Sequence, residues 1–175
     1  MYCVYYKNFF TNNQKTKMSA AWKRRALRDV KDLQDNGFKV TGENGEDEFN
    51  LNCFLTTTQG PESSPYEKCI WRVRFTIPDG FPFLSPSVGI VGKILHPNID
   101  EESGSICLDV LSPKAWSPSF TLRHIVETQL PYLLSYPNPS DPLNRDAAHL
   151  LVTNPEAFKK KATEHSKKNC HVQIQ

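Results

Sequence analysis

Two segments in the first half of the chain alternate polar and apolar residues, and this pattern constrains the fold more than any other feature. They read "NLNCFL", within residues 49–57, and "WRVRFTI", within residues 69–78. A period of two is typical of strands that place one face on a core and the other in water. "FKVTGE" (38–43) and "SVGIVGKI" (87–94) predict two more strands, and "ENGED" and "QGPESSPYEK" supply turn residues. We therefore expect a four-stranded antiparallel meander sheet.

Helical spacing occurs on both sides of this region. Before it, apolar residues recur at steps of three or four between a capping Ser19 and a terminating Gly37: Trp22, Ala26, Val30 and Leu33. After it, residues 121–135, 144–154 and 154–168 predict three helices, the first kinked or broken by Pro131. A helix, then strands, an irregular segment and more helices predict an α+β domain with helices against one face of the sheet.

The length of 175 residues suits one domain. Met18 opens "MSAAWKRR" in the manner of a start site, so we expect a core domain at 18–168 and a C-terminal tail at 169–175. Residues 1–17 are then an extension, disordered or a start-site artefact, and they lack the unbroken apolar run of a signal peptide or membrane helix. Because the net charge is only +2, no global field favours nucleic acid. We expect neither a membrane nor nucleic acid as a partner.

The cysteines are scattered, without the paired spacing of a metal site or a redox motif: Cys3, Cys53, Cys69, Cys107 and Cys170. An odd number of widely spaced cysteines favours free thiols in a reducing compartment. We therefore expect the cytoplasm, the nucleus or both.

Cys107 lies in residues 95–120, a segment that is long for a connection yet rich in apolar residues. Such a segment must lie packed along the domain, and long packed loops often carry function. Three interpretations of Cys107 compete. It could be a buried structural residue, or a nucleophile exposed by the turn "DEESGS". It could also be a metal ligand, but His96 and His124 are too isolated in spacing to complete a metal site with it.

Two nucleophilic chemistries stay open at this point. A cysteine hydrolase would use His96 or His124 as its base. Asn98, nine residues before Cys107, instead suits acyl transfer through a thioester, in which the amide stabilises the developing oxyanion as an amine attacks.

The segment "HPNIDEESGSICLDVL", with the tryptophan that follows, resembles the active-site signature of ubiquitin-conjugating enzymes. "GPESSPYE", "FPFLSPS" and "YPNPSDPLNRDAA" resemble that family's other landmarks in the family's order, so the resemblance covers about Ser19 to His165. The step from Asn98 to Cys107 and "YPNPSDPLN" are most similar to the subgroup known as ubiquitin-conjugating enzyme H. Two features depart from that subgroup. Trp116 follows Cys107 by nine residues, one more than usual, and the C-terminal segment is basic instead of acidic.

The resemblance implies an acyltransferase that works through a cysteine thioester. Cys107 would accept the C-terminal glycine of ubiquitin from an activating enzyme, and a substrate lysine would then attack the thioester. Asp141 and Asp109 match positions that flank the site, where a carboxylate can orient the amine and take up its proton. Turn capping is the alternative role for Asp141, which precedes a proline.

Three further residues match the family's active-site turn. Asn98 would be the oxyanion donor or the brace of a loop, and His96 and Pro97 would be structural. No metal or organic cofactor is expected, because ATP is used by the activating enzyme.

The resemblance also implies protein partners: ubiquitin, an activating enzyme, a RING-type ubiquitin ligase and substrate proteins. The basic face of the first helix resembles the docking site for the activating enzyme, with Lys23, Arg24 and Arg28. Two loops match those that meet a RING-type domain: Phe83, unless it belongs to the core, and Ser117, Pro118 and Ser119. A conjugating enzyme for another ubiquitin-like modifier and a non-catalytic scaffold of the same fold stay open as alternatives.

Overall fold

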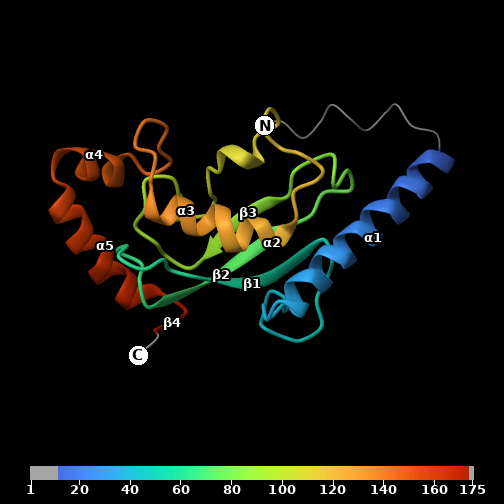
Figure 1. Cartoon of the computed structure of the whole chain (residues 1–175), viewed down its shortest axis with the longest axis horizontal. Coiled ribbons are helices and arrows are strands. Elements are labelled where there is room, and N and C mark those ends of the chain that lie inside the picture. The colour runs from blue at the N-terminus through green and yellow to red at the C-terminus, as the bar shows by residue number, and fades with distance from the viewer. Residues whose placement is uncertain (1–11, 174–175) are drawn as a thin grey trace.

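The computed structural model describes residues 12–173, and its first element is helix α1 (Asn12–Asp35) (Figure 1). Neither glycine nor proline interrupts this stretch, which contains many of the good helix formers lysine, alanine and arginine. Gly37, with φ of +85°, ends the helix in the left-handed conformation. The helix begins before Ser19, so Ser19 is not its cap, and residues 12–17 of the expected extension are helical. The rest of that extension lies outside the described residues.

The four-stranded antiparallel sheet is confirmed, with one strand placed differently from the expectation. β1 (Cys53–Gln59), β2 (Cys69–Thr76) and β3 (Ser87–Val91) pair in chain order, and β4 (Val172–Gln173) pairs with β2. The expected strand at 38–43 contributes only one bridge, in which Thr41 and Leu55 exchange two backbone hydrogen bonds. The chain turns directly afterwards, because the Gly42 N–H donates to the carbonyl of Glu46.

A single helical run crosses the sheet after the irregular segment. It consists of α2 (Leu122–His124), the π-helical segment η2 (Ile125–Gln129) and α3 (Leu130–Ser135). Pro131 was expected to kink or break the helix. The wider π-helical turn lies directly before the first turn of α3, where a proline lacking its N–H is tolerated. The run therefore continues past Pro131.

The last two helices occur where the sequence predicts them, as α4 (Arg145–Thr153) and α5 (Pro155–Asn169). Asn144 and Asn154 cap their N-termini through side-chain oxygens that accept backbone N–H groups. Between β3 and α2 the chain is irregular except for the short 3₁₀ turn η1 (Asp109–Leu111). The expected packed loop is confirmed.

Two groups of buried side chains hold these elements together. The main core lies between α1, the sheet and the run from α2 to α3, and its largest fully buried side chains are Trp71, Tyr66, Phe54 and Phe75. A second, smaller core joins α4 and α5 to Leu95, at the start of the irregular segment. In Figure 1 α1 lies at one end of the sheet, α4 and α5 at the other, and the irregular segment between them.

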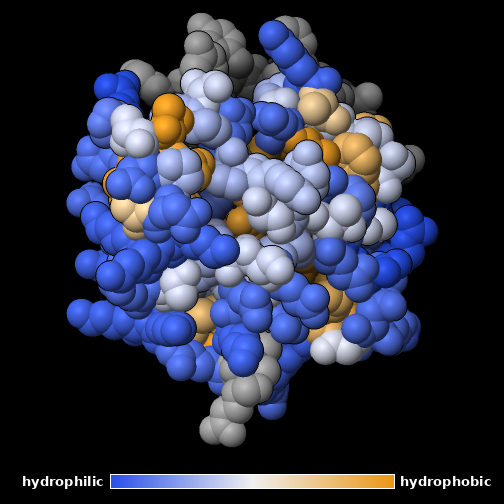
Figure 2. Space-filling model, turned by 60° about the vertical axis from the view of Figure 1, so that its left-hand side comes forward, coloured by the Kyte–Doolittle hydropathy of each residue, from blue (hydrophilic) through white to orange (hydrophobic). Residues whose placement is uncertain are grey.

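The surface toward α4 and α5 is mostly hydrophilic, with hydrophobic atoms only in small separate patches (Figure 2). None of the helices described within 12–173 is both long and apolar enough to cross a bilayer.

Candidate active site

Asn98 and Cys107 lie opposite each other at the open end of a tight hairpin. The Cys107 N–H donates to the Asn98 carbonyl at 2.9 Å, and the next residue on each side forms an antiparallel bridge. At the closed end the Asp100 carboxylate accepts bonds from the Ser103 hydroxyl and backbone N–H, which lower the pKa of Asp100. The nine-residue step of the sequence thereby becomes a direct contact between the two residues.

Gly104 fixes this hairpin against the edge of β3. Its φ is +72°, and a Cβ on it would lie 1.9 Å from the carbonyl oxygen of Ile90. The Ile90 N–H in turn donates to the Gly104 carbonyl at 2.8 Å. Only glycine permits this approach, so the hairpin that presents Cys107 is attached to the sheet by its own backbone.

The buried side chain of Asn98 holds a second loop against the hairpin. Its Nδ2 donates to the carbonyls of Asn138 (2.7 Å) and Asp141 (3.2 Å), and its Oδ1 accepts from the Asn138 N–H (2.8 Å). Both amide hydrogens and the oxygen are therefore used. The segment 138–141, far away in sequence, is brought beside Cys107 by this one side chain.

His96 is fully buried, and both nitrogens of its ring are bonded to backbone groups. Nδ1 accepts the Asn98 N–H at 2.9 Å, so Nε2 carries the proton that it donates to the Leu133 carbonyl at 3.1 Å. Burial lowers the pKa of His96 from 6.5 to about 4, which keeps the ring neutral. The ring thus connects the active-site turn to α3 and has no free lone pair for a thiol proton.

His124, the other candidate base of a hydrolase, is engaged elsewhere. Its ring bonds Gln129, five residues further along the same helical run, and stacks on Phe120. The rings of His96 and His124 are both hydrogen-bonded to groups other than the Cys107 thiol. The geometry therefore gives no support to a Cys-His dyad.

The turn that begins the hairpin is also bonded to the two residues that precede α4. The Pro97 carbonyl accepts the backbone N–H groups of Leu143 and Asn144, each at 2.9 Å. On the other side, the buried Tyr66 hydroxyl donates to the Leu95 carbonyl at 2.7 Å. The residues on both sides of His96 are thereby fixed by contacts with distant parts of the chain.

The Cys107 thiol is half-buried, and its pKa is raised above the usual value of a thiol. Burial is the main cause, and the carboxylates of Asp141 and Asp109 add to it, because negative charge disfavours a thiolate. Both carboxylates belong to exposed residues. The structure thus brings Cys107, Asn98, Asp141 and Asp109 to one place.

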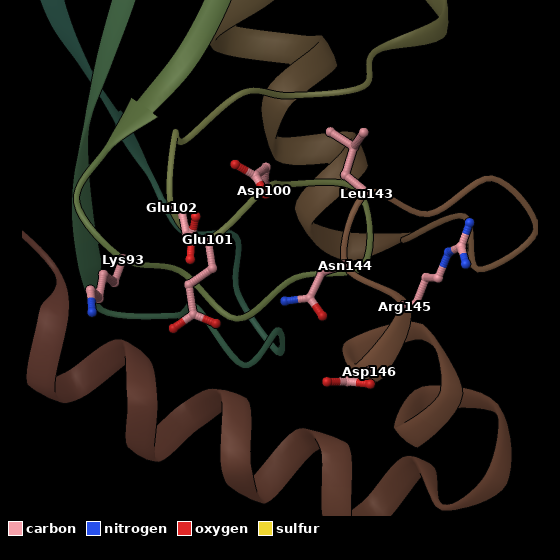
Figure 3. A pocket seen from close by; sticks show the side chains of 8 residues that line it. All are labelled: Lys93, Asp100, Glu101, Glu102, Leu143, Asn144, Arg145 and Asp146. Atoms are coloured by element: carbon pink, nitrogen blue, oxygen red, sulfur yellow. The ribbon is translucent and has the colours of Figure 1, made fainter.

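A hollow of about 550 Å³ adjoins the hairpin and the start of α4 (Figure 3). Four of its lining residues are acidic, Asp100, Glu101, Glu102 and Asp146, against Lys93 and Arg145. Arg145 points away from the carboxylates in Figure 3, so the hollow presents mainly negative charge. Glu101 also bonds the ring of His165 at 3.1 Å, which ties the hairpin to α5.

The basic residues expected to dock an activating enzyme are all exposed on α1: Lys23, Arg24 and Arg28. Phe83 is 77% exposed, so it does not belong to the core. Pro118 and Ser119 are also exposed, on a turn in which the Phe120 N–H donates to the Ser117 carbonyl at 3.0 Å.

Sequence reasoning missed two buried groups that organise this region. Arg25 and Asp29, one turn apart on α1, form an ion pair at 2.8 Å, and their side chains are only 14% and 3% exposed. The same Arg25 donates to the carbonyls of Pro118 and Phe120 in the turn at 117–120. The available signal was the i, i+4 spacing of the ion pair beside the apolar face of the helix, but the same spacing is common on solvated faces. Within residues 12–173 no group of three or more histidine, cysteine or acidic residues is placed to hold a metal ion.

The chain is similar throughout most of its length to one family. The family model described as "Ubiquitin-conjugating enzyme" matches residues 24–166. Ubiquitin-conjugating enzyme E2 6 of Arabidopsis thaliana is 42% identical over 151 residues, which are 86% of this chain and 79% of that protein. Ubiquitin-conjugating enzyme E2-24 kDa of Saccharomyces cerevisiae is 49% identical over 61% of this chain and 48% of its own length. The E2 domain of a Toxoplasma gondii ubiquitin-conjugating enzyme superposes with a TM-score of 0.74 at 28% identity, covering 85% of this chain and 99% of that one.

Proposed function

Because the chain belongs to the ubiquitin-conjugating enzyme family and is a transferase of that class, we propose that Cys107 is the residue that carries ubiquitin. One observation carries the proposal: the hairpin holds the half-buried Cys107 against Asn98, and Asn98 holds the loop with Asp141 beside them. The matched relatives are described as acting with ubiquitin, so another modifier is not favoured.

In the first step the Cys107 thiolate attacks the carbonyl carbon of a ubiquitin thioester on the activating enzyme. The activating enzyme's cysteine leaves as a thiolate and receives the proton that Cys107 has lost. One thioester replaces another, so the step is close to isoergic and needs neither a metal nor an organic cofactor. The raised pKa of Cys107 makes its sulfur a poorer leaving group, which protects the new thioester against premature attack.

In the second step a substrate lysine attacks the thioester carbonyl, and Cys107 leaves. A free lysine amine has a pKa near ~10.4 and is protonated at neutral pH, so it must lose a proton. We assign that proton to the exposed carboxylate of Asp141, with Asp109 orienting the amine. Both charges already act on the Cys107 thiol, which supports their closeness to the reacting centre.

For Asn98 we propose the role of a brace in the resting enzyme. Both of its amide hydrogens are occupied by the carbonyls of Asn138 and Asp141. It could donate to an oxyanion only after one of these bonds has opened. His96 and Pro97 support the same turn through backbone bonds and do not exchange protons with the substrate.

The partner surfaces follow the same proposal. Lys23, Arg24 and Arg28 would dock the activating enzyme, and Phe83 with the turn 117–119 would meet a RING-type ligase. Both roles are supported by the exposure of the three basic residues, Phe83, Pro118 and Ser119, whereas Ser117 is half-buried. Membership of the H subgroup is supported by "YPNPSDPLN" and by the nine-residue step, and a reducing location in the cytoplasm or nucleus by the free cysteines described.

A charging assay tests the proposal. The protein is incubated with activating enzyme, ATP and ubiquitin, and gels are run with and without reductant for wild type, Cys107→Ser and the matched control Cys53→Ser, which replaces another half-buried free cysteine. We expect a reductant-sensitive adduct in wild type and in C53S, and a reductant-resistant one in C107S, because serine forms an oxygen ester. Retention of the sensitive adduct by C107S, or its loss in C53S, would refute the assignment of Cys107.

A further inference from the structure

The guanidinium of Arg25 connects α1 to the turn proposed to meet a ligase. Nε donates to the Asp29 carboxylate at 2.8 Å, and Nη1 and Nη2 donate to the carbonyls of Pro118 and Phe120, each at 2.6 Å. The guanidinium carbon also lies 5.4 Å from the centre of the Phe81 ring. All three nitrogens of this largely buried guanidinium are therefore engaged.

The geometry of these bonds requires arginine. A guanidinium is a rigid planar fork that can reach two carbonyls and a carboxylate at once, whereas an ammonium is a point donor at the end of a flexible stem. Asp29 is almost fully buried, and its second oxygen accepts the Leu122 N–H at 3.4 Å, at the start of α2. The pair thus holds both ends of the segment 118–122.

The same region contains a bond between the two loops proposed to meet a ligase. The Trp116 indole N–H donates to the Pro82 carbonyl at 2.7 Å, one residue before the exposed Phe83. The rings of Phe81, Trp116 and Phe120 follow one another at centroid distances of 6.3 and 5.8 Å, and Arg25 covers the first of them. α1 and the two loops therefore form one bonded and packed unit.

We propose that Arg25 is a positioning residue for ligase-stimulated transfer: its fork holds the turn 117–120 in the shape that a RING-type domain binds. Only 14% of the Arg25 side chain is exposed and its three nitrogens are bonded within the chain, so we place it behind the contact surface. Its contribution is to order the turn before binding, so that the ordering cost does not reduce affinity for the ligase. The inference rests on the proposed ligase surface.

The test uses full-length Arg25→Lys, which keeps the charge and loses the fork, with Lys31→Met as a control. Lys31 is on the same helix in an exposed pair with Asp35. Each protein is charged with ubiquitin, and discharge to free lysine is followed against the concentration of an isolated RING domain that accelerates the wild-type reaction. We expect R25K to need about five to ten times more RING domain for half-maximal stimulation. Charging and unstimulated discharge should stay within about twofold of wild type, and K31M should match wild type.

A second readout and a second variant separate positioning from general destabilisation. Hydrogen exchange at the Phe120 amide, which donates to Ser117, should accelerate about tenfold in R25K without a matching change in β2. The double variant Arg25→Met, Asp29→Leu removes both buried charges, so it should fold and still show the ligase defect.

The outcomes distinguish this inference from the surface on which it rests. Suppose that Phe83→Ala raises the concentration of RING domain needed for half-maximal stimulation and R25K does not. That result would overturn the role of Arg25 and leave the proposed ligase surface in place. If neither variant changes that concentration, the proposed ligase surface and the role of Arg25 both fail. If R25K slows charging and unstimulated discharge as much as stimulated discharge, its effect is a general loss of structure and the proposal is wrong.

Discussion

The Asn98 side chain determines the position of one loop and, through it, the position of a carboxylate. Its Nδ2 bonds the Asp141 backbone carbonyl, so the Asp141 side chain is set beside Cys107 while remaining free to act. The residue types were open to sequence reasoning, since a cysteine, an asparagine and two aspartates stand out by chemistry and spacing. The hydrogen bonds of the Asn98 side chain could not be predicted, because they join segments that are 40 or more residues apart. The pair of Arg25 and Asp29 was also missed, because its spacing on a helix is the same whether the two residues are buried or solvated.

Replacing Asp141 with asparagine tests its proposed role without removing the carbonyl that Asn98 uses. The pKa of Cys107 should fall toward that of a free thiol, so iodoacetamide should alkylate Cys107 faster at a given pH below that pKa. Lysine discharge should slow by roughly 100-fold, because the attacking amine loses its proton acceptor.

Peptide mass spectrometry measures the alkylation of Cys107 in this Asp141→Asn variant, and single-turnover experiments measure its discharge to lysine. Glu102→Gln, an exposed carboxylate in the same hairpin, should change neither, and unaltered discharge in D141N would contradict the assignment.

Among the elements, the helices with clear caps and prolines were predicted well. The proline at the start of α5 and the asparagines before α4 and α5 are local signals that act within one turn. Local signals of this kind did not predict β4, nor did they predict that the strand expected at 38–43 would not form. β4 is two residues long, and its pairing with β2 depends on where α5 delivers the chain. The strand at 38–43 fails because a turn begins at Gly42.

The cap of α5 offers a prediction about this element alone. Asn154→Ala should lower the free energy of unfolding by about 1 kcal/mol, because the Ala157 N–H loses its acceptor. Asn154→Asp keeps an acceptor there and should retain most of the stability. Urea denaturation measures both. Charging of Cys107 should be unchanged in each variant, and a large loss of charging in N154A would mean that the position of α5 governs the site.

For the whole molecule, the buried and neutral His96 links stability to pH. Its pKa is about 4 in the folded protein and near ~6.5 when unfolded, so the unfolded chain binds a proton more readily. The stabilisation is therefore complete above about pH 6.5 and is lost as the pH falls toward 4. Between pH 6.5 and 5 the loss should be roughly 1.5 kcal/mol.

Urea denaturation of wild type and His96→Asn across this range measures the difference in slope. The variant should be less stable at pH 7, because the Leu133 and Asn98 bonds are disturbed, but its stability should fall less steeply between pH 6.5 and 5. If the stabilities of wild type and His96→Asn fall in parallel with pH, His96 is not the group that links stability to pH. In the wild type, NMR should find that His96 does not titrate above pH 5.

The most direct measurement of the central claim is to locate the acyl group within the charged protein. Cys107→Ser is incubated with activating enzyme, ATP and ubiquitin, and the stable ester is digested and sequenced by tandem mass spectrometry. We predict that the C-terminal glycine of ubiquitin is found on residue 107 and that the peptides containing Cys3, Cys53, Cys69 and Cys170 are unmodified. A glycine remnant on any of those cysteines or on a lysine, with residue 107 unmodified, would contradict it.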